Sequence, residues 1–227
     1  MLYIVGTPIG NLEDVTFRAI KILKEVAVIF AEDTRITKKL LNHYSIETKI
    51  YQYHEHNKHY QIENVLRILN DGNSVALVTD AGTPCISDPG YELVDEVIKN
   101  DKKVVAIPGP SALIAAASIS GMNMRRFAFE GFLPKKKGRM TLLTKLKEEE
   151  RTIILYESPY RLKRTLADIE EYLGDRYISI HREITKIYEE TIRGKVSDVI
   201  DKLAEVEIKG EIVIIIEGKF KKGIDRD

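Results

Sequence analysis

The strongest constraint on the fold is the regular alternation of short apolar runs with longer stretches of helical period through the first half of the chain. Apolar runs predict strands, and amphipathic stretches between them predict helices. The predicted strands are Leu2–Val5, Val26–Phe30, Ile50–Tyr53, Val75–Val78 and Val104–Ile107. The predicted helices are Thr16–Glu25, Thr34–His43, Tyr60–Leu69, Leu93–Ile98 and Ser111–Ser120. Such alternation favours an α/β fold with a mostly parallel sheet covered on both faces.

The regular alternation of strand and helix patterns ends at Gly121. Phe127–Phe132 is predicted to be extended, and Ile153–Tyr156 and Ile212–Glu217 to be strands. Tyr177–Ile184 and Tyr188–Arg193 have few residues between them, which favours an antiparallel pair and hence a mixed sheet. We therefore expect two lobes, an N-terminal α/β lobe over residues 1–121 and a mixed C-terminal lobe over residues 122–227.

Composition limits the partners and the cellular location. Lys and Arg number 35, and so do Asp and Glu, so any nucleic-acid surface must be local rather than a property of the whole chain. Cys85 is the single cysteine, which excludes an internal disulfide and a multi-cysteine metal site and favours a cytoplasmic protein. No apolar run is long enough for a signal peptide or a membrane span, so no membrane partner is expected.

Three loops rich in glycine and proline follow predicted strands. They are Gly6-Thr7-Pro8-Ile9-Gly10-Asn11, Asp80-Ala81-Gly82-Thr83-Pro84 continuing to Gly90, and Pro108-Gly109-Pro110-Ser111. Carboxyl ends of strands in one sheet share an edge, and open α/β sheets bind ligands there. Each loop alone reads as an ordinary turn, but three on one edge favour a ligand crevice.

The spacing of the first loop is Gly-x-x-x-Gly, which is neither a dinucleotide fingerprint nor a phosphate-binding P-loop. An adenosyl group recognised by backbone atoms, with a carboxylate at the helix start near Ser111, stays open. A non-catalytic nucleotide-binding sensor built from α/β lobes is also compatible with this pattern.

At the level of whole strings the sequence resembles a known family. The strings are Tyr3–Leu12, Ala31–Arg35, His54–Asn57, Thr79–Gly90, Ile107–Ala112, Glu130–Pro134, Tyr156–Arg161 and Arg182–Lys186. In order, and over nearly the whole chain, they resemble the ribosomal RNA small-subunit 2′-O-ribose methyltransferases of the tetrapyrrole methylase superfamily, whose fold is also called the class III methyltransferase fold.

The resemblance implies a two-lobed homodimeric enzyme that binds S-adenosylmethionine in the cleft between its lobes. The implied reaction is 2′-O-methylation of a cytidine ribose in 16S ribosomal RNA, in the assembled 30S subunit. The cofactor contacts that it implies are Pro8, Asp80, Gly82, Thr83, Ile86, Ser87, Ser111, Tyr156, Pro159, Gly210 and Ile212. Many members carry an additional C-terminal helical segment, whereas this sequence closes with a short charged tail, Lys219–Asp227. RNA contacts from such a segment are therefore not expected.

A ribose hydroxyl is a weak nucleophile, so the reaction would benefit from a base. Glu157, which ends a predicted strand, is the first candidate, followed by Asp33 and His54. For Glu157 and Asp33, capping of the helix that follows is an equally good interpretation. His54, His56 and His59 have a spacing that can chelate a metal, but no cysteine or carboxylate is fixed beside them by spacing, and no metal is expected.

The region after residue 121 is the best local candidate for RNA binding. Its basic residues are Arg125, Arg126, Lys135, Lys136, Lys137 and Arg139, and Arg161 follows at the start of a predicted helix. A solvated loop explains the lysine run equally well. A tetrapyrrole (precorrin-like) C-methyltransferase remains the alternative function, because an acidic macrocycle would also favour basic residues.

Overall fold

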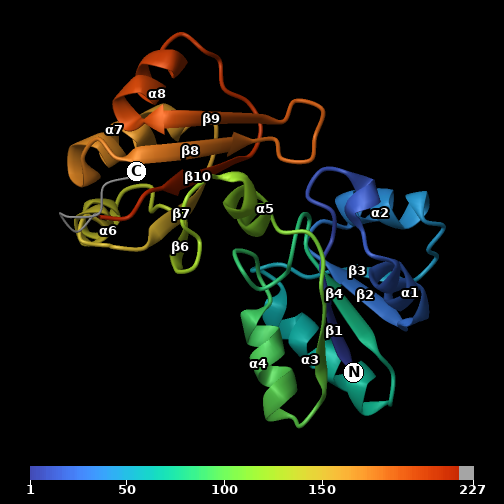
Figure 1. Ribbon diagram of the computed structural model, residues 1–227. Coiled ribbons are helices and arrows are strands. Elements are labelled where there is room, and N and C mark those ends of the chain that lie inside the picture. Colours follow the sequence, from blue (N-terminus) through green and yellow to red (C-terminus); the bar gives the residue numbers. More distant parts are fainter. Residues whose placement is uncertain (220–227) are drawn as a thin grey trace. The chain divides into compact units, whose positions relative to one another are not determined.

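The computed structural model describes residues 1–219, and the charged tail from residue 220 onward lies outside the described residues. The chain divides into two compact units, Met1–Ser111 and Ala112–Asp227. Each unit is built around its own sheet (Figure 1). No helix in the described range is long and apolar enough to cross a membrane.

The first unit contains a five-stranded sheet in the order β3-β2-β4-β1-β5. Its strands are β1 (Leu2–Val5), β2 (Val28–Ala31), β3 (Ile50–Gln52), β4 (Val75–Val78) and β5 (Val104–Ile107). All of their pairings are parallel. The predicted parallel sheet is confirmed, and its strand ends place the three glycine-rich loops on one edge.

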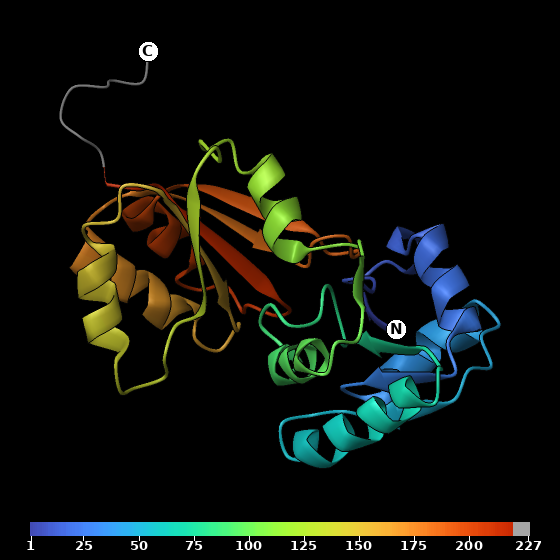
Figure 2. The ribbon, with the colours of Figure 1, turned by 90° about the horizontal axis from the view of Figure 1, so that it is seen from below.

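Helices cover both faces of this sheet (Figure 2). They are α1 (Phe17–Glu25), α2 (Thr34–His43), α3 (Lys58–Asn70) and α4 (Tyr91–Lys99), with a 3-10 turn, η1, at Leu12–Asp14. Successive side chains of a strand point to opposite faces. In β2, Ile29 therefore packs with α1 and α2, whereas Phe30 packs with α3 and α4. This double burial explains why the strands are continuously apolar.

The second unit contains a mixed five-stranded sheet in the order β6-β7-β10-β8-β9. Its strands are β6 (Phe127–Phe132), β7 (Thr152–Glu157), β8 (Tyr177–Arg182), β9 (Glu190–Lys195) and β10 (Ile212–Ile216). Only the β6–β7 pairing is parallel, and the other three are antiparallel. The predicted antiparallel pair is therefore confirmed as β8 and β9.

One face of the second sheet is covered by α6 (Arg139–Leu146), α7 (Leu162–Leu173) and α8 (Val196–Leu203). The small-residue helix α5 (Ala112–Ile119) packs against β10. The carbonyls of Ile119 and Ser120, at the end of α5, accept hydrogen bonds from the Arg193 guanidinium of β9. These contacts place α5 with the second unit, so the division precedes α5 and does not follow Gly121 as expected.

Candidate functional site

The first and second loops are joined directly by their backbones. Thr7 N–H donates to the Gly82 carbonyl at 2.8 Å, and Gly82 N–H donates to the Thr7 carbonyl at 3.1 Å. The buried Thr7 hydroxyl also donates to the carbonyl of Thr79, at the end of β4. Gly82 has φ +86°, a conformation that glycine adopts without a steric cost. The predicted cofactor residues Pro8, Gly82 and Thr83 therefore belong to one connected loop structure.

The first and third loops touch through two glycines. A Cβ on Gly6 would lie 2.8 Å from the Cα of Gly109, and a Cβ on Gly109 would lie 2.8 Å from the Cα of Gly6. Gly6 N–H also donates to the Ile107 carbonyl, at the end of β5. Any side chain at either position would separate the loops. The three loops expected to share an edge are thus physically connected within the first unit, and the third ends at Ser111.

Acidic side chains gather where β2 and β4 end. The Thr79 hydroxyl donates to Glu32 Oε2 at 2.8 Å, and Asp33 N–H donates to Asp80 Oδ1 at 2.9 Å. Burial raises the pKa of Asp80, and the charges of Glu32 and Asp33 add to that shift. This edge of the sheet is therefore negatively charged, which suits a cationic ligand.

Asp88 belongs to the same group, although no sequence motif singled it out. Burial raises its pKa to about 6, and repulsion from Glu32 and Asp80 acts in the same direction, against a hydrogen bond with Thr79. Asp33 differs, because the Arg35 guanidinium and backbone N–H lower its pKa to about 2. Of the two, Asp88 has the pKa better suited to accepting a proton near neutral pH.

Asp33 and His54 occupy different kinds of position. Asp33 is the N-cap of α2 and accepts from Arg35 N–H, which is the capping role that was one of its two interpretations. His54 follows β3, and its Nδ1 is buried without a hydrogen-bond partner among the described residues. Its ring lies 5.8 Å from that of His56. Within residues 1–219, no group of three or more His, Cys, Asp or Glu is arranged to hold a metal ion.

The other predicted cofactor residues of the second loop lie at its surface. Ile86 is 59% exposed, which is unusual for a large apolar side chain, and Ser87 is exposed beside it. The loop bends sharply here, since Cys85 has φ +71° and Gly90 has φ +144°. A Cβ on Gly90 would meet the Cys85 sulfur at 2.6 Å, so the glycine permits the close packing beneath this surface.

In the second unit, Tyr156 lies beside the start of α5. Its hydroxyl accepts a hydrogen bond from Leu113 N–H at 3.2 Å, and its ring makes edge contacts with Phe129 and Phe132 of β6. Phe132 is 55% exposed, so this aromatic group reaches the surface. The predicted cofactor residue Tyr156 therefore lies on the face of the sheet that carries α5, and the predicted residue Pro159 follows the end of β7.

Gly210 and Ile212, at the start of β10, have a structural explanation. Gly210 has φ +89°, and a Cβ there would lie 2.4 Å from the Glu183 carboxyl group. That carboxyl accepts from Glu211 N–H and from Lys186. Ile212 is buried in the core beneath α7. Both residues shape the strand, and their predicted contact with a cofactor stays a prediction.

Glu157 points into the helix-covered core of the second unit. The residue is 2% exposed, and its carboxylate accepts from the Thr165 hydroxyl at 2.6 Å and from Ser158 N–H at 2.8 Å and pairs with Arg161. Alternation along β7 requires this, because Ile153 and Leu155 lie on the same face. The geometry therefore favours the structural interpretation of Glu157, as an anchor for the start of α7, over the role of base.

The basic stretch is split by β6. Arg125 and Arg126 precede the strand, and the exposed Lys135, Lys136 and Lys137 follow it. Arg139 is 4% exposed and binds Asp168, Thr165 and the Pro134 carbonyl. Arg161 is held by Glu157 and the Leu133 carbonyl. Both guanidinium groups are engaged inside the unit, and the expected contact of Arg139 and Arg161 with RNA stays a prediction.

Comparisons with known proteins agree with this arrangement. The model of the tetrapyrrole (corrin/porphyrin) methylases matches residues 1–200. A ribosomal RNA small subunit methyltransferase I of Halalkalibacterium halodurans is 52% identical over 97% of this chain and 77% of its own length. One of Thermotoga maritima is 50% identical over 96% of this chain and 98% of its own.

Solved structures share the fold at much lower identity. A cobalt precorrin-4 methyltransferase of cobalamin biosynthesis has a TM-score of 0.72 at 19% identity, covering 95% of this chain and 94% of its own. A uroporphyrin III C-methyltransferase from Thermus thermophilus has a TM-score of 0.68 at 19% identity, covering 95% of this chain and 96% of its own. At such identities the likeness shows the fold alone.

Proposed function

The chain belongs to the tetrapyrrole methylase family, together with the ribosomal RNA small subunit methyltransferase I proteins, and on that premise we propose that it 2′-O-methylates a cytidine ribose in 16S ribosomal RNA. The cofactor of the family is S-adenosylmethionine. Its sulfonium supplies the methyl group in electrophilic form, which leaves positioning and proton transfer to the protein.

One observation carries the cofactor assignment: the three glycine-rich loops are joined to one another at an acidic edge of the first sheet. Gly6 and Gly109 bring backbones close together, as a ligand read by backbone groups requires. Glu32, Asp80 and Asp88 surround Thr79 at the same edge and complement a ligand that bears a sulfonium and an ammonium group. The residues present therefore fit this cofactor.

The reaction forms a bond between the ribose oxygen and the methyl carbon, breaks the bond between that carbon and sulfur, and releases the hydroxyl proton. Asp88 is our first candidate to accept that proton, because its raised pKa of about 6 makes it a stronger base than Asp33. His54 stays a second candidate. Glu157 is assigned to positioning the start of α7, through Thr165 and Arg161.

The exposed lysines after β6, Lys135, Lys136 and Lys137, are proposed to contact RNA phosphates. We further propose that the substrate is the assembled 30S subunit, that the enzyme is a homodimer and that it acts in the cytoplasm. The names of the relatives support a small-subunit substrate. The single cysteine supports a reducing compartment.

The test is a methyl-transfer assay with S-adenosylmethionine labelled in the methyl group. The acceptors are small ribosomal subunits from cells that lack the modification, the deproteinised RNA, and a precorrin-like tetrapyrrole. The proposal is supported if the label is found on a cytidine nucleotide and remains on the ribose after the cytosine base has been removed. Label in the tetrapyrrole would establish the alternative C-methyltransferase, and label in no acceptor would favour a non-catalytic binding protein.

A further inference from the structure

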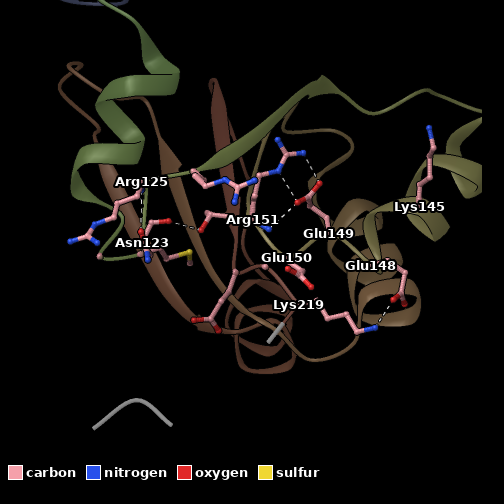
Figure 3. A pocket seen from close by; sticks show the side chains of 14 residues that line it. Asn123, Arg125, Lys145, Glu148, Glu149, Glu150, Arg151 and Lys219 are labelled. Atoms are coloured by element: carbon pink, nitrogen blue, oxygen red, sulfur yellow. Dashed lines mark hydrogen bonds and ion pairs between the residues drawn. The ribbon is translucent and has the colours of Figure 1, made fainter. Parts of the chain in front are cut away.

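An open hollow lies at the end of the second sheet where β6 and β7 begin and β10 finishes. It has a volume of about 940 Å³, and all of its lining residues belong to the second unit (Figure 3). Its walls come from the α5–β6 connection, from α6, from the α6–β7 turn and from the residues after β10. It is therefore distinct from the glycine-rich loops of the first unit.

The wall of the hollow is tightly built at Gly218. A Cβ on this glycine would lie 2.1 Å from the Glu150 carbonyl oxygen, and Lys219 N–H donates to the Glu149 carbonyl at 2.7 Å. The residues after β10 are thereby fixed against the α6–β7 turn. A surface with fixed backbone presents its side chains in a defined arrangement, which lowers the entropic cost of binding.

Two of the acidic side chains in the hollow already have cationic partners. Arg151 forms a two-pronged ion pair with Glu149, and Lys219 pairs with Glu148 at 2.5 Å (Figure 3). The Arg151 contacts lower the pKa of Glu149 to about 2, so this pair stays ionised at neutral pH. These two pairs offset their own charges, and the charged side chains that remain in the lining are three cations and the carboxylates of Glu150 and Glu217.

Arg125, Arg126 and Lys145 are those cations. All three are exposed, and within residues 1–219 none of their side chains makes an ion pair or hydrogen bond. Arg125 and Lys145 lie on opposite sides of the hollow in Figure 3. Unpaired cations on both sides of a groove form a charge pattern that suits the phosphates of an extended polyanion better than a single small ion.

The position of the hollow relative to Lys135–Lys137 gives it a consequence for RNA binding. The two groups lie at opposite ends of β6, a strand of six residues, which at ~3.3 Å per residue separates them by roughly 20 Å. A single nucleotide cannot reach both. Contact with both requires a longer segment of RNA, or two segments brought together by its fold.

We infer that the hollow bordered by Arg125, Arg126 and Lys145 is a second phosphate-backbone site, which binds a part of the substrate RNA other than the nucleotides at Lys135–Lys137. This rests on the proposed function for the identity of the RNA. Its exposed cations are expected to contact phosphates, which adds affinity without reading bases. Its contribution to affinity must therefore depend strongly on salt.

The experiment uses the full-length protein and fluorescently labelled small-subunit ribosomal RNA made by transcription. Binding is titrated from 50 to 300 mM KCl for the wild type and for the triple variant Arg125→Gln/Arg126→Gln/Lys145→Gln. Lys202→Gln, on the exposed surface of α8, is the matched control for loss of a charge. Thermal unfolding of each variant shows that the fold is kept.

The slope of log K against log salt is negative, and losing three phosphate contacts on single-stranded RNA reduces its steepness by about 2. We expect that decrease in the triple variant, with affinity about tenfold weaker at 100 mM KCl, and wild-type behaviour in the Lys202→Gln variant. A wild-type slope in the triple variant would overturn the inference, as would wild-type protein that binds no RNA. Loss of binding to assembled subunits with unchanged binding to bare RNA would assign the hollow to a ribosomal protein instead.

Methyl transfer is measured in parallel, so that the two proposals can fail separately. Methylation of ribosomal RNA with an unaltered salt slope contradicts only the second phosphate site. A reduced slope without methyl transfer in the wild type contradicts only the proposed reaction.

Discussion

The Cα of Gly6 and the Cα of Gly109 face each other so closely that a Cβ on either residue would lie 2.8 Å from the other's Cα. The contact is between backbones, which cannot move aside as a flexible side chain does. It joins the loop after β1 to the loop after β5, and the Thr7–Gly82 backbone pair joins the first of these to the loop after β4. The proposed cofactor site depends on this contact.

We expect Gly6→Ala to lower the affinity for S-adenosylmethionine at least tenfold, because the two loops must separate. The added methyl group should also cost about 1–3 kcal/mol of unfolding free energy, as is usual for overpacking. Calorimetric titration and urea unfolding measure the two effects. Gly72→Ala is the matched control: Gly72 has φ +82° with nothing within 4 Å of its Cβ position. It should lose stability only, and equal cofactor affinity in the two variants would contradict the proposed site.

The acidic edge predicts a specific dependence of stability on pH. The pKa of Asp88 is raised to about 6 by burial and by the neighbouring carboxylates of Glu32 and Asp80. A raised pKa means that the folded protein holds this proton more tightly than the unfolded chain, so the stabilisation is complete below about pH 4 and is lost as the pH rises to about 6. Asp88→Asn should therefore gain stability relative to the wild type over that interval.

Urea unfolding at pH 4, 5, 6 and 7 checks this prediction as a difference between the two proteins, which cancels the other titrating groups. Asp33→Asn is the contrasting variant, because the pKa of Asp33 is lowered to about 2 and its contribution is lost only in more acidic solution. A difference between wild type and Asp88→Asn that stays constant from pH 4 to 7 would show that Asp88 titrates normally.

Glu157→Ala tests whether this carboxylate anchors α7. The substitution leaves the Thr165 hydroxyl and Arg161 without their buried partner, which should cost about 3 kcal/mol of unfolding free energy. Turnover should fall because the protein is less stable, and should recover when it is assayed at low temperature. The exposed Glu170 of α7 provides the control Glu170→Ala, which should behave as the wild type. A large loss of turnover at full stability would restore Glu157 as the base.

Replacing Lys135, Lys136 and Lys137 by glutamine tests the lysines that follow β6. If each contacts a phosphate of single-stranded RNA, the negative slope of log K against log salt should become less steep by about 2. Fluorescence titration with small-subunit RNA measures it, with Lys202→Gln as the single-charge control. An unaltered slope would show that these lysines are solvated surface.

The local sequence pattern was sufficient to predict the strands of both sheets, but it did not predict the unit to which α5 belongs. The bounds of β6, Phe127–Phe132, were predicted to the residue, because alternation and turn signals are properties of neighbouring residues. The assignment of α5 to the first lobe followed from Gly121 and the change of pattern after it. Its packing against β10 and its contacts with Arg193, 73 residues beyond Ser120, place it with the second unit, and such contacts leave no mark on the local sequence.

The site shows the same limit. Alternate residues of a strand share a face, so the sequence of β7 could have shown that Glu157 lies on the same face as the apolar Ile153 and Leu155. Its burial could therefore have been predicted. The burial of Arg139 against Asp168, 29 residues away, could not have been predicted from the local sequence. Nor could the raised pKa of Asp88 have been predicted, since it arises from burial and from the carboxylates of Glu32 and Asp80, which come together only when β2 and β4 pair.

The central claim is that the joined loops of the first unit bind the methyl donor, and calorimetric titration of the folded full-length protein with S-adenosylmethionine tests it most directly. We expect saturable heat with one cofactor per chain, and a large loss of affinity in Gly6→Ala. Absence of heat in wild-type protein whose unfolding transition is cooperative would contradict the claim.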